Sequence, residues 1–341
     1  MKKIVLSLAA CFLVGFMLQA QTVEDFEVKT DFESQFKKVK TAPKKIYIHN
    51  FAVYYQLLYM DSDVAAGGRE IGGGYRSDAS ASLLLGIAGI PQDELQKSVD
   101  NAYNEYVARL KAKGFEIITP DEALKTETLA GWSKAMGGTP SETFMPGYVS
   151  VTPTGYEFLY NEKGGGFNLE SRISKDLEGA VVANVSIILP AFEDGESAAS
   201  KAAGKSLGGI AKVVAKANFR IGEGLWIKNN SLKGGFPITS NVAFIYKKSL
   251  KYQAAANFKP KKEVEIEGVF DPKKKYKAVE SASQDLWGSS NGAFTVFSVN
   301  DQTMKKTQAV ECDPKKYVKG ADMAVSMYVS KSLDKFLMHF K

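Results

Sequence analysis

The sequence predicts a mixed α/β or α+β fold, with a β-α-β core, an antiparallel β addition and a C-terminal helix. Three observations support this. Residues 91–124 show an amphipathic helix, a glycine, a short apolar run and a capped second helix. Residues 46–59 before them are dense in β-branched and aromatic residues, as strands are. The second half of the chain alternates strand-like stretches with turn residues.

The helix between residues 91 and 113 is the clearest single element. Pro91 suits a helix start, and Gly114 suits the left-handed residue that ends one. A short strand is expected at 115–118, and Thr119, Pro120 and Glu122 form a capping box for a second helix. Apolar residues recur along the long helix in steps of three and four: Leu95, Val99, Ala102, Tyr103, Tyr106, Val107 and Leu110.

Residues 1–20 have the pattern of a signal peptide. Lys2 and Lys3 precede an apolar run, and Ala20 is a small residue of the kind that signal peptidase accepts. The sequence therefore predicts export to the periplasm or outer membrane, with Gln21 as the first mature residue.

A second interpretation of the leader places the cleavage earlier. Residues 8–11 match the bacterial lipobox, and cleavage before Cys11 would leave a lipid anchor there. We favour cleavage after Ala20, because the apolar stretch before Cys11 is at the lower limit of about 7 residues. In that case Cys312 is the one cysteine of the mature chain, and no intramolecular disulfide can form.

Charge argues against a nucleic-acid partner. Removing Lys2 and Lys3 lowers the formal net charge from +6 to +4. The lysines between 247 and 277 are interrupted by Glu263, Glu265 and Glu267, whereas nucleic acids select a one-sided basic patch. We therefore expect no nucleic-acid partner. Contact with a membrane is left open.

Composition divides the chain as follows: 1–20 signal peptide, 21–45 linker, 46–130 β-α-β core, 131–176 irregular insertion, and 177–341 a β-rich part with a C-terminal helix, packed on the same core. Within the core, one strand running to Tyr59 is expected to lead into a mobile glycine-rich loop at 67–74, and Leu83–Leu85 are expected to form a second short strand. Later expectations are strands at 179–190, 211–227, 242–252, 263–270 and 294–299, a hairpin formed by the second and third of these, and a helix at 321–340.

No residue pattern predicts a catalytic, cofactor-binding or metal site. His49 lies inside a predicted strand and His339 at the tail, and a histidine in a strand is usually a structural residue. Cys312 is followed by Asp313 and Pro314 with no histidine nearby, so we interpret it as a small buried apolar residue.

Two loop motifs are incomplete. Asp61-Ser62-Asp63 begins like a calcium loop, but Ala65 and Ala66 replace the next oxygen ligand and the turn glycine. Gly204-Lys205-Ser206 is similar to the end of a phosphate-binding loop, but Ala199 replaces its first glycine.

Four segments carry a resemblance to a known family. They are IYIHNF from Ile46, YNEYVARLKAKGFEIITPDEAL from Tyr103, GAVVANVSIILPAFEDG from Gly179 and AKANFRIGEGLWIKNNSLKGG from Ala215. In order and pattern they resemble the curli-secretion-channel family of outer-membrane lipoproteins, within residues 46–124 and 179–250. The resemblance implies an α/β envelope protein that assembles into rings, with Ser197–Gly209 or the strands after them facing the membrane.

Two features depart from that family. Its members are lipidated at the mature N-terminus, and residues 131–170 and 260–341 have no counterpart in it. The resulting hypothesis is a non-enzymatic, exported envelope protein that acts in assembly or secretion and self-associates or binds another envelope component. The alternative is an exported hydrolase or small-ligand-binding protein, whose site combines scattered Asp, Glu, Ser and Tyr residues.

Overall fold

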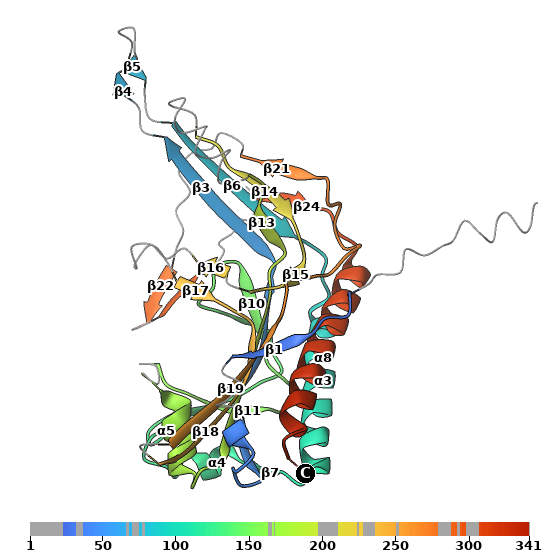
Figure 1. Cartoon of the computed structure of the whole chain (residues 1–341). Coiled ribbons are helices and arrows are strands. Elements are labelled where there is room, and N and C mark those ends of the chain that lie inside the picture. The colour runs from blue at the N-terminus through green and yellow to red at the C-terminus, as the bar shows by residue number, and fades with distance from the viewer. Residues whose placement is uncertain are drawn as a thin grey trace, which may run out of the picture.

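An eight-stranded sheet forms the centre of the computed structural model (Figure 1), which describes residues 23–31, 37–65, 68–69, 75–76, 79–162, 166, 168–196, 211–223, 225–227, 236–249, 252–278, 288–291, 294–297 and 307–340. The strand order is β1-β19-β18-β12-β2-β10-β9, and β7 also pairs with β2. The bounds are β1 (Val28–Asp31), β2 (Lys45–Gln56), β7 (Glu116–Ile118), β9 (Ser141–Glu142), β10 (Tyr148–Val151), β12 (Val181–Leu189), β18 (Asn241–Ser249) and β19 (Tyr252–Pro260).

The centre of this sheet is parallel and its outer part is antiparallel. Strand β2 pairs in parallel with β12 on one side and with β7 on the other. Helix α3 (Gln92–Ala112) lies between β2 and β7 in the chain, which confirms the expected β-α-β core. Strands β18, β19 and β1 then extend the sheet antiparallel, as the predicted fold class requires.

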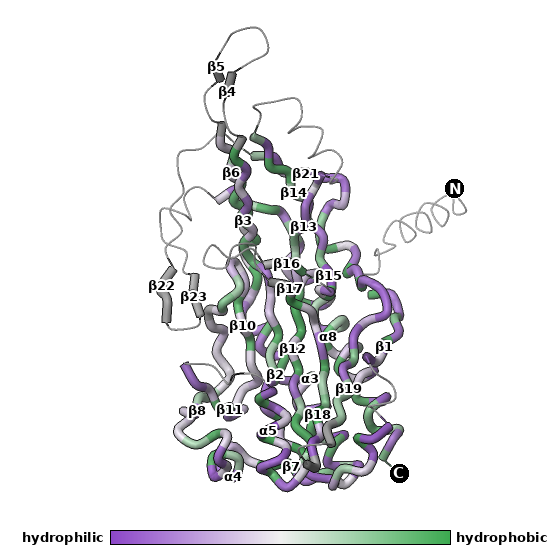
Figure 2. The backbone as a smooth tube through the Cα atoms, turned by 60° about the vertical axis from the view of Figure 1, so that its left-hand side comes forward, coloured by the Kyte–Doolittle hydropathy of each residue, from purple (hydrophilic) through white to green (hydrophobic). Residues whose placement is uncertain are grey.

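Helices α3 and α8 (Pro314–Leu337) lie side by side on one face of this sheet (Figure 1). The predicted stripe of α3 faces the core, since Leu95, Val99, Tyr106 and Leu110 are all at most 1% exposed. Figure 2 shows hydrophobic stretches along the central strands. Apolar residues of α3 and α8 belong to the same core cluster as those of the strands. From α8, Phe336 stacks on Phe244 of β18 with ring centroids 3.7 Å apart.

The opposite face carries shorter elements. Helices α4 (Pro120–Ala123) and α5 (Leu169–Asp176) cover it together with the strand pair β8 (Ser133–Met136) and β11 (Glu157–Tyr160). Thr119 caps α4 as predicted, its Oγ1 accepting a hydrogen bond from the Glu122 N–H at 3.3 Å. A second apolar cluster forms there around Tyr47, Ile173 and Val182.

The irregular insertion expected at 131–176 is wrong as a description of structure. This stretch contains β8, β9, β10, β11 and α5, and β10 is a strand of the main sheet. Its glycines and prolines separate short strands instead of forming one long loop; Gly147, Pro153 and Gly155 lie between elements. Burial of Tyr148 and Val151 holds β10 against β2.

The linker expected at 21–45 is also wrong for its described part. Strand β1 pairs with β19, and Val23 forms a β-bridge with Ile266. Phe26, Val28 and Val39 are buried in the main core. These apolar residues are spaced along a lysine-rich stretch, so composition alone concealed an edge strand.

Two groups of strands project beyond the main sheet (Figure 1). In the first, β3 (Leu58–Ala65) pairs with β6 (Ala79–Ile87), which also pairs with β24 (Gln308–Val310). Strands β4 (Gly68–Arg69) and β5 (Tyr75–Arg76) lie at its tip. In the second, β14 (Val214–Ala217) pairs with β13 (Phe192–Asp194) and with β21 (Lys275–Lys277). The short strand expected at Leu83–Leu85 is confirmed as part of β6.

Long-range pairing overturns two strand expectations. The strand expected to run to Tyr59 is broken at Leu57, because the N–H groups of Leu57 and Leu58 both donate to the carbonyl of Gly147, at 2.9 and 3.0 Å. The hairpin expected between 211–227 and 242–252 does not form, since β18 pairs with β12 and β19 instead. The remaining short strands pair as β15 (Arg220–Ile221) with β20 (Val264–Glu265), β16 (Leu225–Ile227) with β17 (Phe236–Ile238), and β22 (Gly288–Asn291) with β23 (Phe294–Phe297).

The C-terminal helix begins earlier than the pattern indicated. Asp313 is its N-cap, accepting a hydrogen bond from the Lys315 N–H at 3.0 Å, and Pro314 occupies the first turn. In the described part of the chain, no helix combines the length and hydropathy that crossing a membrane requires. The predicted leader with Cys11 and Gln21, the glycines at 72–74 and the segment 197–210 lie outside the described residues.

Candidate functional site at the base of the projecting strands

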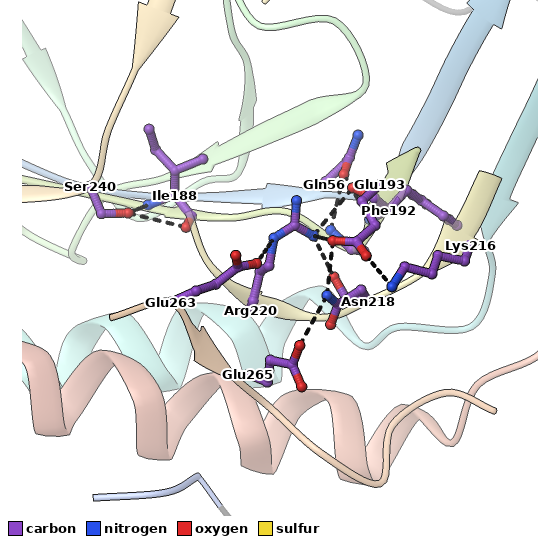
Figure 3. Close-up of polar contacts among 11 residues, drawn as sticks. Gln56, Ile188, Phe192, Glu193, Lys216, Asn218, Arg220, Ser240, Glu263 and Glu265 are labelled. Atoms are coloured by element: carbon purple, nitrogen blue, oxygen red, sulfur yellow. Dashed lines mark hydrogen bonds and ion pairs between the residues drawn. The ribbon is translucent and has the colours of Figure 1, made fainter. Parts of the chain in front are cut away.

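A buried arginine lies where the second projecting group leaves the main sheet. Arg220 begins β15, directly after β14, and is 7% exposed. A buried guanidinium remains charged and therefore needs compensating groups around it. The surrounding residues supply them, and we call this network the Arg220 junction (Figure 3).

Two carboxylates hold the Arg220 guanidinium. Its Nε lies 2.5 Å from Glu263 Oε1, and its Nη1 lies 3.6 Å from Glu193 Oε2. Nη1 also donates to the backbone carbonyls of Asn218 at 2.8 Å and Phe192 at 3.3 Å. The arginine thus connects β13, the β14–β15 turn and the residue directly before β20.

Glu193 is the second charged centre of the junction. It forms an ion pair with Lys216, and its Oε2 accepts a hydrogen bond from Asn218 Nδ2 at 3.0 Å. Burial alone would raise the pKa of Glu193, but the hydrogen bonds from Lys216 and Asn218 and the charge of Arg220 outweigh burial and lower that pKa. Glu193 therefore stays ionised at neutral pH.

Side chains from the main sheet fix the chain on either side of the junction. Gln56, the last residue of β2, accepts hydrogen bonds through Oε1 from the N–H groups of Ala191 and Phe192, at 3.0 and 3.1 Å. The Ser240 hydroxyl oxygen accepts from the Ile188 N–H at 2.9 Å. The direction in which β13 leaves β12 is thereby set by contacts at the end of the core.

The two projecting groups are also in contact with each other. The ring of Tyr59 on β3 lies 5.6 Å from that of Phe192 on β13. The Asp63 carboxylate accepts a hydrogen bond from the Lys212 N–H just before β14, at 3.1 Å. Apolar residues of both groups, including Leu83, Leu85 and Ala215, belong to the main core.

A cleft of about 640 Å³ opens beside the junction. Phe219 and Phe270 form part of its wall, with their rings edge to face at 6.5 Å. Asn218 and Glu265 belong to both the junction and the cleft, and Asn218 Nδ2 lies 3.5 Å from Glu265 Oε1 (Figure 3). The size is that of an ordinary ligand or peptide site. The remaining lining residues are Ala217, Ile266, Glu267, Gly268, Asp271 and Pro272.

His49 occupies a β-bulge on the opposite face from α3 and α8. The register between β2 and β12 pairs Ile48 with Ala183 and Asn50 with Asn184. His49 therefore has no opposite residue on β12. Its ring lies 5.9 Å from that of Tyr47 and 6.0 Å from that of Trp132, and its buried Nδ1 has no hydrogen-bond partner among the described residues.

Burial lowers the pKa of His49. The negative charge of Glu170 on α5 acts in the opposite direction and raises that pKa, but by less. Asn184 joins this carboxylate to the strand, because Asn184 Nδ2 donates to Glu170 Oε1 at 3.1 Å and Asn184 Oδ1 accepts from Asn50 Nδ2 at 3.2 Å. His49 is therefore neutral at neutral pH, within a small polar group on an otherwise apolar face. His339 follows α8, on the other face of the sheet.

The other residues singled out in the sequence remain apart from the Arg220 junction. Cys312 is half-buried, and burial together with Asp313 raises the pKa of its thiol to about 11, so the thiol is protonated at neutral pH. Asp61 and Asp63 are part of strand β3 and not of a loop. Among the described residues, no group of three or more His, Cys, Asp and Glu side chains is placed to hold a metal ion.

The Arg220 junction was not predicted from the sequence. A single arginine in the strand-like stretch 211–227 was a usable signal, because a charge in such a run is either exposed or compensated. Its partners Glu193 and Glu263 are far away in sequence, so no local pattern identified them. Comparison with known proteins found no matching family model, no matching curated protein and no matching solved structure.

Proposed function

We propose that this chain is an exported, non-enzymatic protein of the cell envelope that acts in assembly or secretion and self-associates through its projecting strands. Export rests on the signal-peptide pattern of residues 1–20. Self-association rests on the projecting strands and on the resemblance of residues 46–124 and 179–250 to a ring-forming family.

The observation that carries the proposal is the presence of open strand edges. Within the described residues, β3 is an edge strand of one projecting group, and β13 and β21 are the edge strands of the other. An edge strand presents backbone donors and acceptors that a strand from another chain can pair with.

The Arg220 junction supports the same function. It joins the second projecting group to the main sheet through Arg220, Glu193 and Glu263. A rigid base holds the edge strands in one orientation, which lowers the entropic cost of associating with another copy. This arrangement suits a structural role, with no need for a reaction centre.

The test is the mass in solution of residues 21–341, measured by light scattering with and without detergent. We expect a species several times heavier than the monomer. Val64 on β3 is 68% exposed, and Val64→Lys places a charge beside the open edge. This variant should lower the oligomeric fraction severalfold. Met338→Lys is the matched control, because Met338 is 69% exposed but lies at the end of α8.

A monomer in both conditions contradicts self-association. The alternative, an exported hydrolase or ligand-binding protein, then becomes the better account. The cleft beside Phe219 and the polar group around His49 and Glu170 would be the first places to test for a ligand.

A further inference from the structure

The cleft beside the Arg220 junction has apolar walls and an acidic rim. Phe219 is 2% exposed and Phe270 half-buried, whereas Glu265, Glu267 and Asp271 are exposed. Neither Glu265 nor Glu267 forms an ion pair within the described part of the chain. The described residues that line the cleft include no lysine or arginine, whereas Lys261 and Lys262 line the neighbouring pocket that Glu265 and Glu267 also border.

The complementary charge is present on the edge strand β21 of the same chain. Lys275 and Lys277 are exposed, and the buried Tyr276 between them packs into the core. Both lysines lie on an edge strand of the three-stranded sheet, and both are exposed. Lys274, by contrast, already forms an ion pair within the chain, with its Nζ 3.1 Å from Glu311 Oε2.

We propose that the cleft beside Phe219 receives the lysine edge of β21, Lys275 and Lys277, from a second copy of the chain. This inference rests on the proposed self-association and names the surface that produces it. The two ammonium groups bind Glu265 and Glu267 at the rim. The lysine stems, which are apolar, lie against the walls formed by Phe270 and its neighbours.

Size and charge both favour a peptide segment over a single small cation. A cleft of about 640 Å³ exceeds the space that one lysine side chain fills, and it accommodates two side chains on alternate positions of a strand. Because complementary charges mainly select the partner and suppress wrong ones, the acidic rim gives the interface specificity as well as attraction.

The experiment is a reciprocal exchange of charge, followed by light scattering at several protein concentrations. One variant carries Glu265→Lys and Glu267→Lys, and the other carries Lys275→Glu and Lys277→Glu. Each variant alone brings like charges together, and we expect association at least about tenfold weaker than in the wild type. An equimolar mixture should recover wild-type association, because each variant then meets opposite charges on its partner.

The control variant has the same change of charge elsewhere. Lys315→Glu with Lys319→Glu alters two exposed lysines on α8 and should associate like the wild type. Rescue on mixing cannot come from misfolded chains, so recovery also shows that both variants fold.

The outcomes separate this inference from the proposed function. A monomeric wild type overturns both. An oligomeric wild type with unchanged charge variants, or with variants that mixing fails to rescue, overturns only the assignment of this surface. Weakening by the control variant as strong as by the others would show a general charge effect and would also overturn the assignment.

Discussion

Arg220 shows how one residue can determine the direction of a whole strand group. The side chain is buried, and its two carboxylate partners are Glu193 on β13 and Glu263, which directly precedes β20. Removing the arginine takes one charged partner from the largely buried Glu193, and losing a partner in a buried ion pair costs more than losing one in an exposed pair. The buried charge of Arg220 therefore favours the arrangement in which Glu193 and Glu263 both lie beside it.

Replacing Arg220 should be strongly destabilising. We expect Arg220→Ala to lower the free energy of unfolding by about 3 kcal/mol, because Glu193 loses its buried partner and the space is left unfilled. Urea denaturation measures the change. Arg109→Ala is the control: Arg109 pairs with exposed Asp334 and Glu105, so its loss should cost less than about 1 kcal/mol. Equal costs would contradict a structural role for the junction.

His49 makes stability depend on pH. Burial lowers its pKa in the folded chain below the ordinary value of about 6.5 that holds in the unfolded chain. Between these two pKa values the unfolded chain binds more protons than the folded chain, so stability rises with pH and is lost as pH falls below about 6.5.

Replacing His49 by an apolar ring should remove this dependence. We expect His49→Phe to flatten the change in urea midpoint between about pH 5.5 and 7.5, a window above the titration of ordinary carboxylates. Comparing the slope of the variant with that of the wild type isolates the contribution of His49. An unchanged slope would mean that His49 is not the titrating group.

At the scale of elements, the chain turns from β2 to β3 at Leu57, where it packs against Gly147 of another segment. Gly147 has a φ of 77°, and its carbonyl accepts the hydrogen bonds from both Leu57 and Leu58. A Cβ on Gly147 would lie 2.2 Å from the Leu58 carbonyl oxygen. The chain can therefore turn out of the main sheet into the first projecting group only with glycine at this position.

Gly147→Ala should destabilise the fold more than a glycine change at an open site. Gly155 has a similar φ of 72°, but a Cβ there would meet nothing within 4 Å. We expect Gly155→Ala to cost about 1 kcal/mol, from backbone strain alone, and Gly147→Ala at least about 1 kcal/mol more. Thermal unfolding of the two variants gives the difference. Equal costs would show that the loop at Gly147 shifts to admit the methyl group.

At the scale of the whole molecule, one core joins segments from nearly the full length of the chain. Phe26 near the beginning packs against Tyr328 of α8, with ring centroids 6.2 Å apart. The Tyr328 hydroxyl donates to the carbonyl of Phe258 at 2.7 Å. The N-terminal segment, the second half of the sheet and the C-terminal helix therefore stabilise one another. Composition alone did not show that the core includes the N-terminal segment, because the contacts are made with residues far away in sequence.

The sequence by itself determined the elements with a local signature. Helix α3 is encoded by a repeat of apolar residues every three or four positions, its glycine stop and the following Thr119 cap, all close together along the chain. Strand β12 is encoded by a continuous apolar run, and the mixed fold class follows from the order of such elements. These features depend on neighbouring residues, so they can be predicted without knowing the fold.

Only the tertiary structure decided which strands pair and which charges meet. The pairing of β2 with β12, the break at Leu57 and the junction of Arg220 with Glu193 and Glu263 depend on residues far apart in sequence. Backbone hydrogen bonds are nearly the same for every pair of strands, so local sequence does not select the partner. The packing of the whole core selects which strands pair. The same packing brings together the residues of the candidate site.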